Sequence, residues 1–475
     1  MRILLVLPAA EQYRVTSRSQ PVPRRAMLRF SLLSLTTVAA LTPPGHEVVL
    51  CDENVQPLDF DAQVDVVGVS FMTALAPRAY GIAARFRHRG VVTVAGGYHP
   101  TLCPDDAAAH FDAVVVGDAE PLWPQVVKDI EAGSLKKVYR SDAPCDLATV
   151  PVPRRELTAH TRRYYATTAA VQAGRGCVHG CTYCSVAAFH GGTYRARPVE
   201  HVVAELKTLP RNLMFVDDNI IADPAYAHTL FTAMLPLNKK WVSQCSLTIA
   251  DDPELLALAR QAGCRGMFIG IETFDGANLN RVDKNFNGVA TMRTRIRQIR
   301  RQGIGVIAGI IVGMDNDTKH VFARTVRLLD EARVDALQLS IMTPLPGTPL
   351  FATLERSGRI TSRDWNAYDF RHCVIAPARM TAEDLQDGAD WLYREFYRPW
   401  RIALRTLRTL VTCGMIPALL GLKLNLTYLH DIVRERIAGR NPAVAHDPVS
   451  ANGWRSRLTI PLQACVQGAD GCRPD

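Results

Sequence analysis

The sequence contains no run of about 18 uncharged apolar residues, which is the length that a membrane-spanning helix requires. The stretch that comes nearest, residues 410–422, is shorter and contains Pro417. The first apolar run stops at Pro8 and Glu11, too soon for the apolar region of a normal signal peptide. We therefore expect neither a spanning helix nor a signal peptide, and we predict that residues 3–7 form a buried first strand.

The sequence also lacks the dense cysteine pattern of small secreted proteins. It has 12 cysteines, most of them scattered singly along the chain. The scattered ones are Cys51, Cys103, Cys145, Cys245, Cys264, Cys373, Cys413, Cys465 and Cys472. We predict that most of these are reduced thiols in the core, which favours a cytoplasmic protein.

The length and charge set further bounds. A chain of 475 residues exceeds what one hydrophobic core usually holds, so two or three domains are expected, and a hydrophobic content of 48% suffices for real cores. The net charge of +9 leaves open an acidic partner, an anionic lipid or a solvated basic face. We predict no nucleic-acid partner.

Short apolar runs recur through the first 140 residues, separated by segments of helix length. They are rich in Val, Ile and Leu, a pattern typical of parallel strands that are buried on both faces. We predict an α/β fold here, a doubly wound, Rossmann-like domain over residues 1–140. Ligands of such sheets bind beyond the carboxyl ends of the strands. The candidate residues at these ends are Ser70, Thr73, Gly96, Gly97, His99, Gly117 and Glu120.

Three further regions follow. Residues 141–164 are punctuated by proline and are predicted to be a linker. Strand and helix patterns alternate again over residues 165–375, and since a full (β/α)8 barrel takes about 250 residues, we predict a partial barrel. Residues 376–475 are predicted to be helical, with a Thr-x-x-Asp cap at the start and a loose tail at the end.

Three cysteines lie within eight positions of one segment, GRGCVHGCTYCSV at residues 174–186. They have C-x3-C-x2-C spacing and are Cys177, Cys181 and Cys184. Core thiols, a zinc site with His179 or His190 as fourth ligand, and an iron–sulfur cluster are all open interpretations. A structural zinc site usually has a second pair of ligands, which we do not find downstream. A cubane on three thiolates instead leaves one iron open to a small molecule.

The segment GCVHGCTYC resembles the signature of radical S-adenosylmethionine (SAM) enzymes, with Tyr183 at its aromatic position. The resemblance implies a partial (β/α)6 barrel, a [4Fe-4S] cluster on the three cysteines, and SAM at the open iron. It further implies SAM contacts from Tyr183, Asp217, Asp218, Asn219, Glu272 and Gly313. From the residues alone, the two aspartates also suit a helix N-cap, Glu272 an exposed loop and Gly313 a turn, and these alternatives stay open.

A doubly wound domain ahead of such a barrel resembles the cobalamin-binding subgroup of radical SAM enzymes, on the segments AGGYHP and VVVGDAE. The resemblance implies a bound cobalamin, with Ser70, Thr73, Gly96 and Gly97 along its tail. The D-x-H-x-x-G motif that supplies histidine to cobalt in many cobalamin proteins is absent. His99 is the candidate to touch the corrin, although a strand-end histidine is more often a hydrogen-bonded structural residue. An ordinary nucleotide-type domain is the alternative.

The combined resemblance implies a methyltransferase that acts on an unactivated carbon of a lipid or secondary metabolite. In this hypothesis a 5'-deoxyadenosyl radical abstracts hydrogen, and the substrate radical takes a methyl group from methylcobalamin. The nearest alternative is a cyclase or oxidoreductase with the same cofactors. A tRNA methylthiotransferase needs three more cluster cysteines, and the surroundings of Cys51, Cys103 and Cys145 do not suit that role. An iron–sulfur sensor does not explain the barrel.

Two kinds of partner are implied besides the substrate. A reduced ferredoxin or flavodoxin is the expected electron donor, and a basic face would help an acidic donor to dock. Residues 11–48, residues 343–351 and the aromatic C-terminal helices resemble members of the subgroup that act on lipids such as hopanoids. The stretch from Arg398 to Arg408 suits either a membrane surface or a helix that faces the core. Peripheral association with the inner face of the membrane therefore stays open.

Overall fold

The computed structural model describes residues 1–10, 28–30, 33–141 and 143–438. Met1–Thr427 form one compact unit and Tyr428–Asp475 a second. The features described below belong to the first unit, except the end of the last helix, Met415–Ala438, which runs into the second. The predicted loose tail and most of the segment 11–32 lie outside the described residues.

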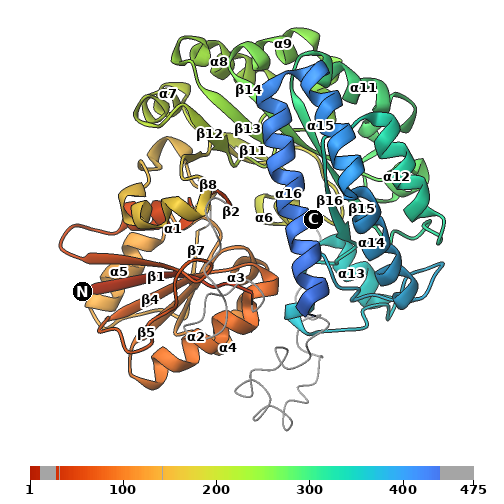
Figure 1. The fold of residues 1–475 in the computed structure, drawn as a ribbon. Coiled ribbons are helices and arrows are strands. Elements are labelled where there is room, and N and C mark those ends of the chain that lie inside the picture. Colours follow the sequence, from red (N-terminus) through yellow and green to blue (C-terminus); the bar gives the residue numbers. More distant parts are fainter. Residues whose placement is uncertain (11–27, 31–32, 142, 439–475) are drawn as a thin grey trace, which may run out of the picture. The chain divides into compact units, whose positions relative to one another are not determined.

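The N-terminal part of the chain is a six-stranded parallel sheet covered by helices (Figure 1). Its strand order is β3-β1-β4-β5-β6-β7. The strands are β1 (Arg2–Leu7), β3 (Glu47–Asp52), β4 (Val66–Ser70), β5 (Val92–Gly96), β6 (Ala113–Val116) and β7 (Val138–Arg140). The helices are α1 (Ser34–Leu41), α2 (Ala76–His88), α3 (Tyr98–Leu102), α4 (Pro104–His110) and α5 (Trp123–Glu131). The predicted first strand and doubly wound fold are confirmed.

This sheet carries a hydrophobic core on each face. On one face, side chains such as Leu4 and Val69 pack with Phe86 of α2 and Phe111 at the end of α4. On the other face, Leu5 and its neighbours pack with residues of α1 and α5, including Trp123. Because both faces are covered, nearly every position of the central strands is apolar, and this is why the strands were visible in the sequence.

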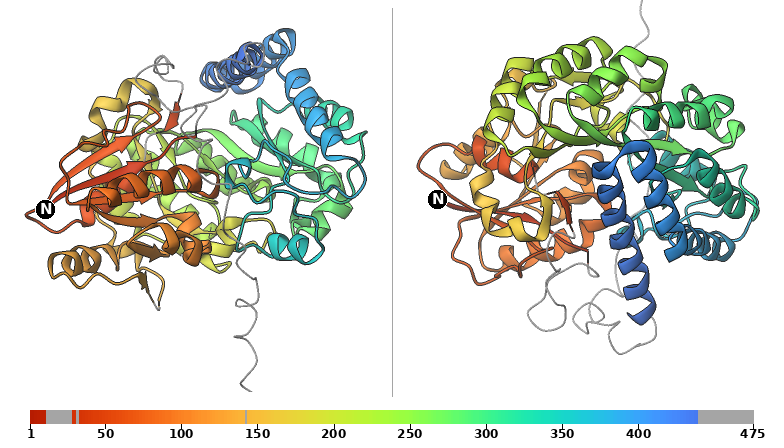
Figure 2. Two further views of the ribbon diagram at one scale, coloured as in Figure 1. Left: turned by 90° about the horizontal axis from the view of Figure 1, so that it is seen from below. Right: turned by 45° about the horizontal axis from the view of Figure 1, so that its top comes forward.

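The second half is another open sheet of six parallel strands, in the order β16-β15-β14-β13-β12-β9. The strands are β9 (Ala170–Val171), β12 (Asn212–Phe215), β13 (Lys240–Gln244), β14 (Cys264–Glu272), β15 (Gly305–Val312) and β16 (Ala336–Ile341). Figures 1 and 2 show the connecting helices along its outer face. They are α7 (Val199–Thr208), α8 (Pro224–Met234), α9 (Pro253–Gln261), α10 (Gly276–Arg281), α11 (Val289–Arg301) and α12 (Val321–Ala332), and α13 (Pro349–Arg356) follows β16. This arrangement confirms the partial (β/α)6 barrel.

Short elements complete the unit. An antiparallel pair joins β10 (Gly174–Gly176) to β11 (Tyr194–Ala196), and a parallel pair joins β2 (Leu28–Phe30) to β8 (Tyr165–Thr167). The predicted linker contains a 3-10 helix, η4 (Arg155–Tyr164), and the segment after β16 contains η8 (Trp365–Ala367). The domain limits proposed from the sequence stay a prediction.

The C-terminal region is helical, as predicted, with α14 (Ala382–Phe396), α15 (Pro399–Cys413) and α16 (Met415–Ala438). Thr381 and Asp384 form a complete capping box at the start of α14, which confirms the predicted cap. Pro399 begins α15, because a proline is tolerated only in the first turn of a helix. In the part of the chain that the structure describes, no helix is both long and apolar enough to cross a membrane.

Candidate functional site

The three clustered cysteines lie on one loop at the carboxyl edge of the barrel sheet, between β10 and α6 (Ser185–His190). Cys184 is the N-cap residue of α6, and its N–H donates to the carbonyl of Cys181 (3.0 Å). Burial raises the pKa of the Cys181 thiol to about 11 and also raises that of Cys184. Since thiols bind metals as thiolates, the loop releases protons when it takes up a cluster.

Asp217, Asp218 and Asn219 follow β12 and hold this loop by its backbone. Asp217 is fully buried and accepts hydrogen bonds from the N–H groups of Ala173 (3.1 Å) and Gly174 (2.6 Å). Burial raises the pKa of Asp217 to about 7, against the opposing effect of these two donors. The helix that follows, α8, is capped by Asp223 instead, so the alternative of an N-cap at Asp217 or Asp218 was wrong.

The other two side chains extend the same contact. The carboxylate of Asp218 accepts from the N–H of Gly176 (2.8 Å). Asn219 accepts from the N–H of Ser246 (2.9 Å), and its Nδ2 lies 3.9 Å from the sulfur of Cys177. These three residues therefore set the course of the cysteine loop. Their predicted contact with SAM stays a prediction.

Glu272 ends β14 and forms a buried ion pair with Lys284, with 2.6 Å between Oε1 and Nζ. The ammonium group also donates to the hydroxyl of Tyr183 (3.2 Å), the aromatic residue of the cysteine motif. Burial works against the charge of Lys284, but Glu272 and the nearby Cys181 outweigh it, so the pKa of Lys284 lies above its usual value. Glu272 is thus not in an exposed loop, and its position at the end of β14 brings it to the cysteine loop.

The backbone around Glu272 is built to make room for this pair. Glu272 has a φ of +66°, which is rare for a residue with a side chain, and the strand register shifts beside it. At Gly270, a Cβ atom would lie 2.3 Å from Oε1 of Glu272 and 2.8 Å from Nζ of Lys284. A side chain at this position would therefore have to displace the ends of Glu272 and Lys284, which form the ion pair. Lys284 was missed in the sequence, because it lies in a loop with no motif around it.

Gly313 follows β15 and takes a φ of +95°. Its N–H donates to the buried carboxylate of Asp317 (2.9 Å), and a Cβ there would lie 2.6 Å from Leu385 of α14. The geometry explains the glycine as a turn packed under a helix. A contact between Gly313 and SAM remains a prediction.

In the N-terminal domain, the predicted residues gather at the carboxyl edge of the sheet. Ser70 ends β4, Gly96 ends β5 and Gly117 follows β6. Among the described residues, no atom lies within 4 Å of a Cβ built at Gly96 or Gly117, so the backbone is open to a ligand there. Gly97 is different, because a Cβ at this residue would lie 3.0 Å from the backbone of Phe71. An open, glycine-lined edge fits a cofactor that needs close approach to the backbone.

His99 is fully buried, and both of its ring nitrogens have partners. Nε2 lies 3.0 Å from Asp106 and 3.0 Å from the hydroxyl of Tyr80, and Nδ1 lies 3.3 Å from the hydroxyl of Thr73. Asp106 also accepts from the indole N–H of Trp365 (3.1 Å), a residue that follows the last strand of the barrel sheet. His99 is thus a hydrogen-bonded core residue, and the hydroxyl of Thr73 is one of its hydrogen-bond partners.

The carboxyl edges of the two sheets meet at the cysteine loop. Arg175, two residues before Cys177, donates to Asp118 (2.9 Å) and binds both oxygens of Glu120 (2.5 and 3.0 Å). Asp118 also accepts from Arg195 of β11 (2.6 Å). Burial works against the charge of Asp118, but the two arginines outweigh it and hold its pKa below the usual value. Both carboxylate oxygens of Glu120 accept from Arg175, and the predicted contact of Glu120 with a cofactor stays a prediction.

A second contact between the edges comes from Tyr98, directly after Gly97. Its ring packs against Phe189 of α6, with 4.8 Å between the ring centroids. Burial raises the pKa of Tyr98, and the neighbouring Asp218 and Cys184 add to the effect. Tyr98, Arg175 and Asp118 were not predicted, since nothing in the local sequence indicates a partner so far along the chain.

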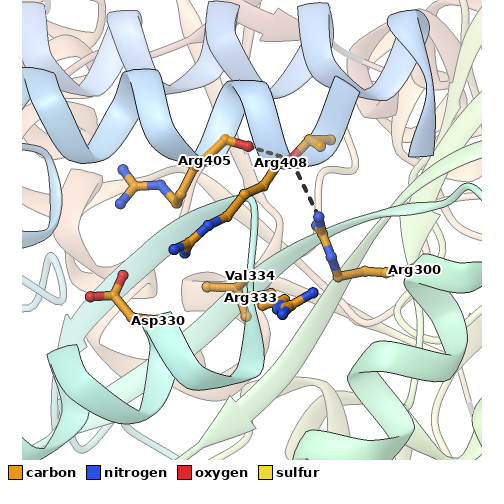
Figure 3. Close-up of a pocket in the computed structure, with 7 residues that line it drawn as sticks. Arg300, Asp330, Arg333, Val334, Arg405 and Arg408 are labelled. Atoms are coloured by element: carbon orange, nitrogen blue, oxygen red, sulfur yellow. Dashed lines mark hydrogen bonds between the residues drawn. The ribbon is translucent and has the colours of Figure 1, made fainter. Parts of the chain in front are cut away.

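The residues present fit an iron–sulfur cluster better than a single metal ion. Among the described residues, no three His, Cys, Asp or Glu side chains come together as ligands of one ion. The thiols of a cubane bind different irons, so they need not converge on one point. The pocket in Figure 3 lies elsewhere, beneath α15. It is lined by Arg300, Asp330, Arg333, Val334, Arg405, Arg408 and Thr409.

Comparisons with known proteins agree with this architecture. Residues 171–364 match the sequence model of the Radical SAM superfamily, and residues 30–127 match that of the B12 binding domain. Bacteriochlorophyllide d C-12(1)-methyltransferase of Chlorobaculum tepidum is 29% identical over 77% of this chain and 82% of its own length. Hopanoid C-2 methylase of Rhodopseudomonas palustris is 27% identical over 76% of this chain and 72% of its own length.

A solved structure shows the same fold over nearly the whole chain. It is the cobalamin-dependent SAM radical enzyme OxsB with aqua-cobalamin and SAM bound, with a TM-score of 0.64 and 12% identity. The match covers 94% of this chain and 81% of that chain.

The fold, the cysteine loop and the matched domains define a radical SAM enzyme. Because a B12 binding domain precedes the barrel and its edge meets the cysteine loop, the chain belongs to the cobalamin-binding radical SAM enzymes. Its cofactors are a [4Fe-4S] cluster, SAM and cobalamin. The predictions of family, fold and cofactors are confirmed.

Proposed function

We propose that this protein transfers a methyl group to an unactivated carbon of a bulky, mostly apolar metabolite, such as a tetrapyrrole or a polycyclic lipid. One observation carries the proposal: Arg175 ties the strand ends of the N-terminal domain to the loop that bears Cys177. This arrangement would set the methyl source beside the site where the substrate is activated. The methyltransferase and methylase named above support methylation over other radical reactions.

The side chains have separate tasks in this proposal. Cys177, Cys181 and Cys184 hold the cluster, and the carboxylate of Asp217 keeps their loop in place. The ion pair of Glu272 and Lys284 lies beside them and orients Tyr183. When bound, the cluster, SAM and cobalamin supply radical and methyl-transfer chemistry that protein side chains lack.

The test is a labelling experiment on the full-length enzyme, reconstituted anaerobically with iron, sulfide and cobalamin. The substrate candidates are a bacteriochlorophyllide and a hopanoid, and SAM carries a deuterated methyl group. We expect a product heavier by one labelled methyl, with one 5'-deoxyadenosine formed for each product. A product that forms without the label contradicts methyl transfer and favours the cyclase or oxidoreductase.

Two cysteine variants control this experiment. Cys181→Ala removes a ligand from the loop, so we expect loss of iron, of 5'-deoxyadenosine and of product. Cys264→Ala removes a buried thiol from β14 of the same barrel, away from the loop. We expect it to keep its iron and its activity, and loss of iron in both variants would contradict the assignment of the loop.

We further propose two partners. A reduced ferredoxin or flavodoxin supplies electrons, which is tested by replacing chemical reductant with each protein and following 5'-deoxyadenosine. The second partner is a membrane surface to which the protein attaches peripherally.

A further inference from the structure

Helix α15 presents its apolar side chains to solvent. The exposed residues recur at spacings of four, three and four, which places them on one face of the helix. They are Trp400 (55% exposed), Leu404 (37%), Leu407 (60%) and Val411 (79%), with Leu410 beside them. A helix on the surface of a globular protein normally has its apolar stripe against the core. In α15 the apolar stripe faces outward.

The buried face of α15 is held by polar contacts. Thr409 donates to Asp335, which also forms a buried ion pair with Arg300 of α11. Arg405 donates to Asn425 of α16 (3.2 Å), and Asn425 donates to the carbonyl of Asp335 (2.9 Å). Figure 3 shows Arg405 and Arg408 of α15 above this region, with Arg300 below them. Arg300 also donates to the hydroxyl of Thr409 (3.4 Å). Together with the buried side chains of Ile402 and Cys413, these contacts hold the inner face of the helix. Burial in the core therefore does not explain the apolar side chains on its outer face.

The first half of α16 continues the same surface. The exposed apolar residues there are Met415, Ile416, Leu419, Leu420 and Leu426. Their spacing keeps them on one side of the helix. We call the exposed apolar side chains of residues 400–426 the apolar face.

The charged residues of the chain segment that bears the apolar face have one sign. Residues 398–430 contain five Arg or Lys residues and no Asp or Glu. Two of the five are paired with acids of other segments, Arg398 with Glu395 and Arg401 with Asp330. Arg408 and Lys423 are exposed among the apolar side chains. Apolar residues flanked by basic ones are typical of helices that lie in the interface of an anionic membrane.

The apolar face is distant from the candidate active site along the barrel. Pro417 of α16 lies 3.5 Å from a Cβ built at Gly305, the first residue of β15, and the thiol of Cys413 donates to the carbonyls of Arg300 and Ile304. The two helices therefore pack at the amino ends of the strands, whereas the cysteine loop lies at their carboxyl ends. The face is free to bind a partner while the site works.

We propose that the apolar face docks on the surface of an anionic lipid bilayer, with Arg408 and Lys423 at the headgroups. A second copy of the chain fits less well, because a two-fold interface brings the same basic residues together on both sides. The inference rests on the proposed membrane attachment but not on methyl transfer, because binding and methylation have separate measurements.

The test is flotation of the full-length holoprotein with vesicles of phosphatidylcholine alone or with 30% phosphatidylglycerol. We expect binding to the anionic vesicles, weakened by salt. The variant L407D/V411D should lose at least tenfold in affinity, because it puts two charges into the apolar face. The variant R408Q/K423Q should lose about fivefold for each basic residue removed.

A matched control carries the same two added charges elsewhere. V152D/L235D changes two exposed apolar residues outside the apolar face and should bind vesicles like the wild type. All variants should keep the iron content of the wild type, since none touches the site.

Three outcomes would overturn the inference. The first is that L407D/V411D and the wild type bind vesicles equally well. The second is that the wild type binds both kinds of vesicle equally well. The third is that ultracentrifugation shows a dimer that L407D/V411D abolishes, while the protein does not bind vesicles. Loss of methylation with vesicle binding intact would instead contradict only the proposed function.

Discussion

Breaking the ion pair between Arg175 and Glu120 should loosen the cysteine loop from the N-terminal domain. Both side chains are largely buried, with 14% and 6% of their surface exposed, and they are joined by two hydrogen bonds. Arg175→Met leaves the Glu120 carboxylate buried without this partner. Removal of one partner from a buried pair costs about 3–5 kcal/mol. We expect a cost in the lower part of that range, because Asp118 still has its ion pair with Arg195.

A double-mutant cycle measures the interaction itself. The variants are Arg175→Met, Glu120→Gln and the two combined. We expect the combined variant to be less destabilised than the sum of the two single variants, by about 2 kcal/mol. This coupling corresponds to a factor of about 30 in the opening equilibrium.

Hydrogen exchange is a suitable assay, because it reports local opening in a protein with several parts. The amides of Gly174 and Gly176 donate to Asp217 and Asp218, so their exchange follows opening of the loop. Peptides that contain these residues are followed by mass spectrometry in all four proteins.

An exposed ion pair is the control. Arg293 and Glu331 are about half exposed, and we expect a coupling below about 0.5 kcal/mol for them. If the costs of Arg175→Met and Glu120→Gln simply add, the two side chains do not act together and the contact between the sheet edges does not hold the loop.

Three further predictions concern the barrel. Asp217→Asn should lower the iron content by at least half, because the amide puts an N–H group where a carboxylate oxygen accepts from the N–H of Ala173. Asp223→Asn, at the N-cap of α8, should leave both stability and iron nearly unchanged, because Asn caps a helix about as well as Asp. Lys284→Met leaves Glu272 buried without its cation, so SAM binding, measured by equilibrium dialysis, should weaken at least tenfold. Lys284→Arg should restore part of this binding. Unchanged binding in Lys284→Met would contradict a role of Lys284 in the site. Burial raises the pKa of Asp317 to about 6, so its contribution to stability is complete below about pH 4 and is lost as the pH rises through 6. The free energy of unfolding of the wild type relative to Asp317→Asn should therefore fall by about 2–3 kcal/mol between pH 4 and 7, and a difference that does not change with pH would refute this.

The long strands were predictable because they are buried on both faces, which makes the whole run apolar, as in β4 and β15. Shorter strands were not found. β7 has three residues with exposed ends, and β9 has only two residues, so neither leaves a pattern in the sequence. The 3-10 helix η4 was missed for a related reason, since prolines and charges surround it.

The orientation of α15 was also not predictable. Periodicity shows that a helix has an apolar stripe, but it does not show which side faces the core. The sequence suggested either a membrane helix or a core helix over residues 398–408. In the structure the side with Arg405 and Thr409 faces inward and the side with Leu407 faces outward. Contact of the outer side with a membrane stays a proposal.

The sequence by itself determined the chemistry that depends on local spacing. Cys177, Cys181 and Cys184 lie on one loop because only six residues separate the first from the last. Glu272 at the end of β14 reaches that loop because parallel strands end at the same edge. Only the tertiary structure decided which distant residues complete the site. Lys284 meets Tyr183 from 101 positions away, and Arg175 meets Glu120 from 55 positions away. The first pair is selected by packing within the barrel and the second by packing between the two domains. Neither kind of packing can be read from a short stretch of sequence.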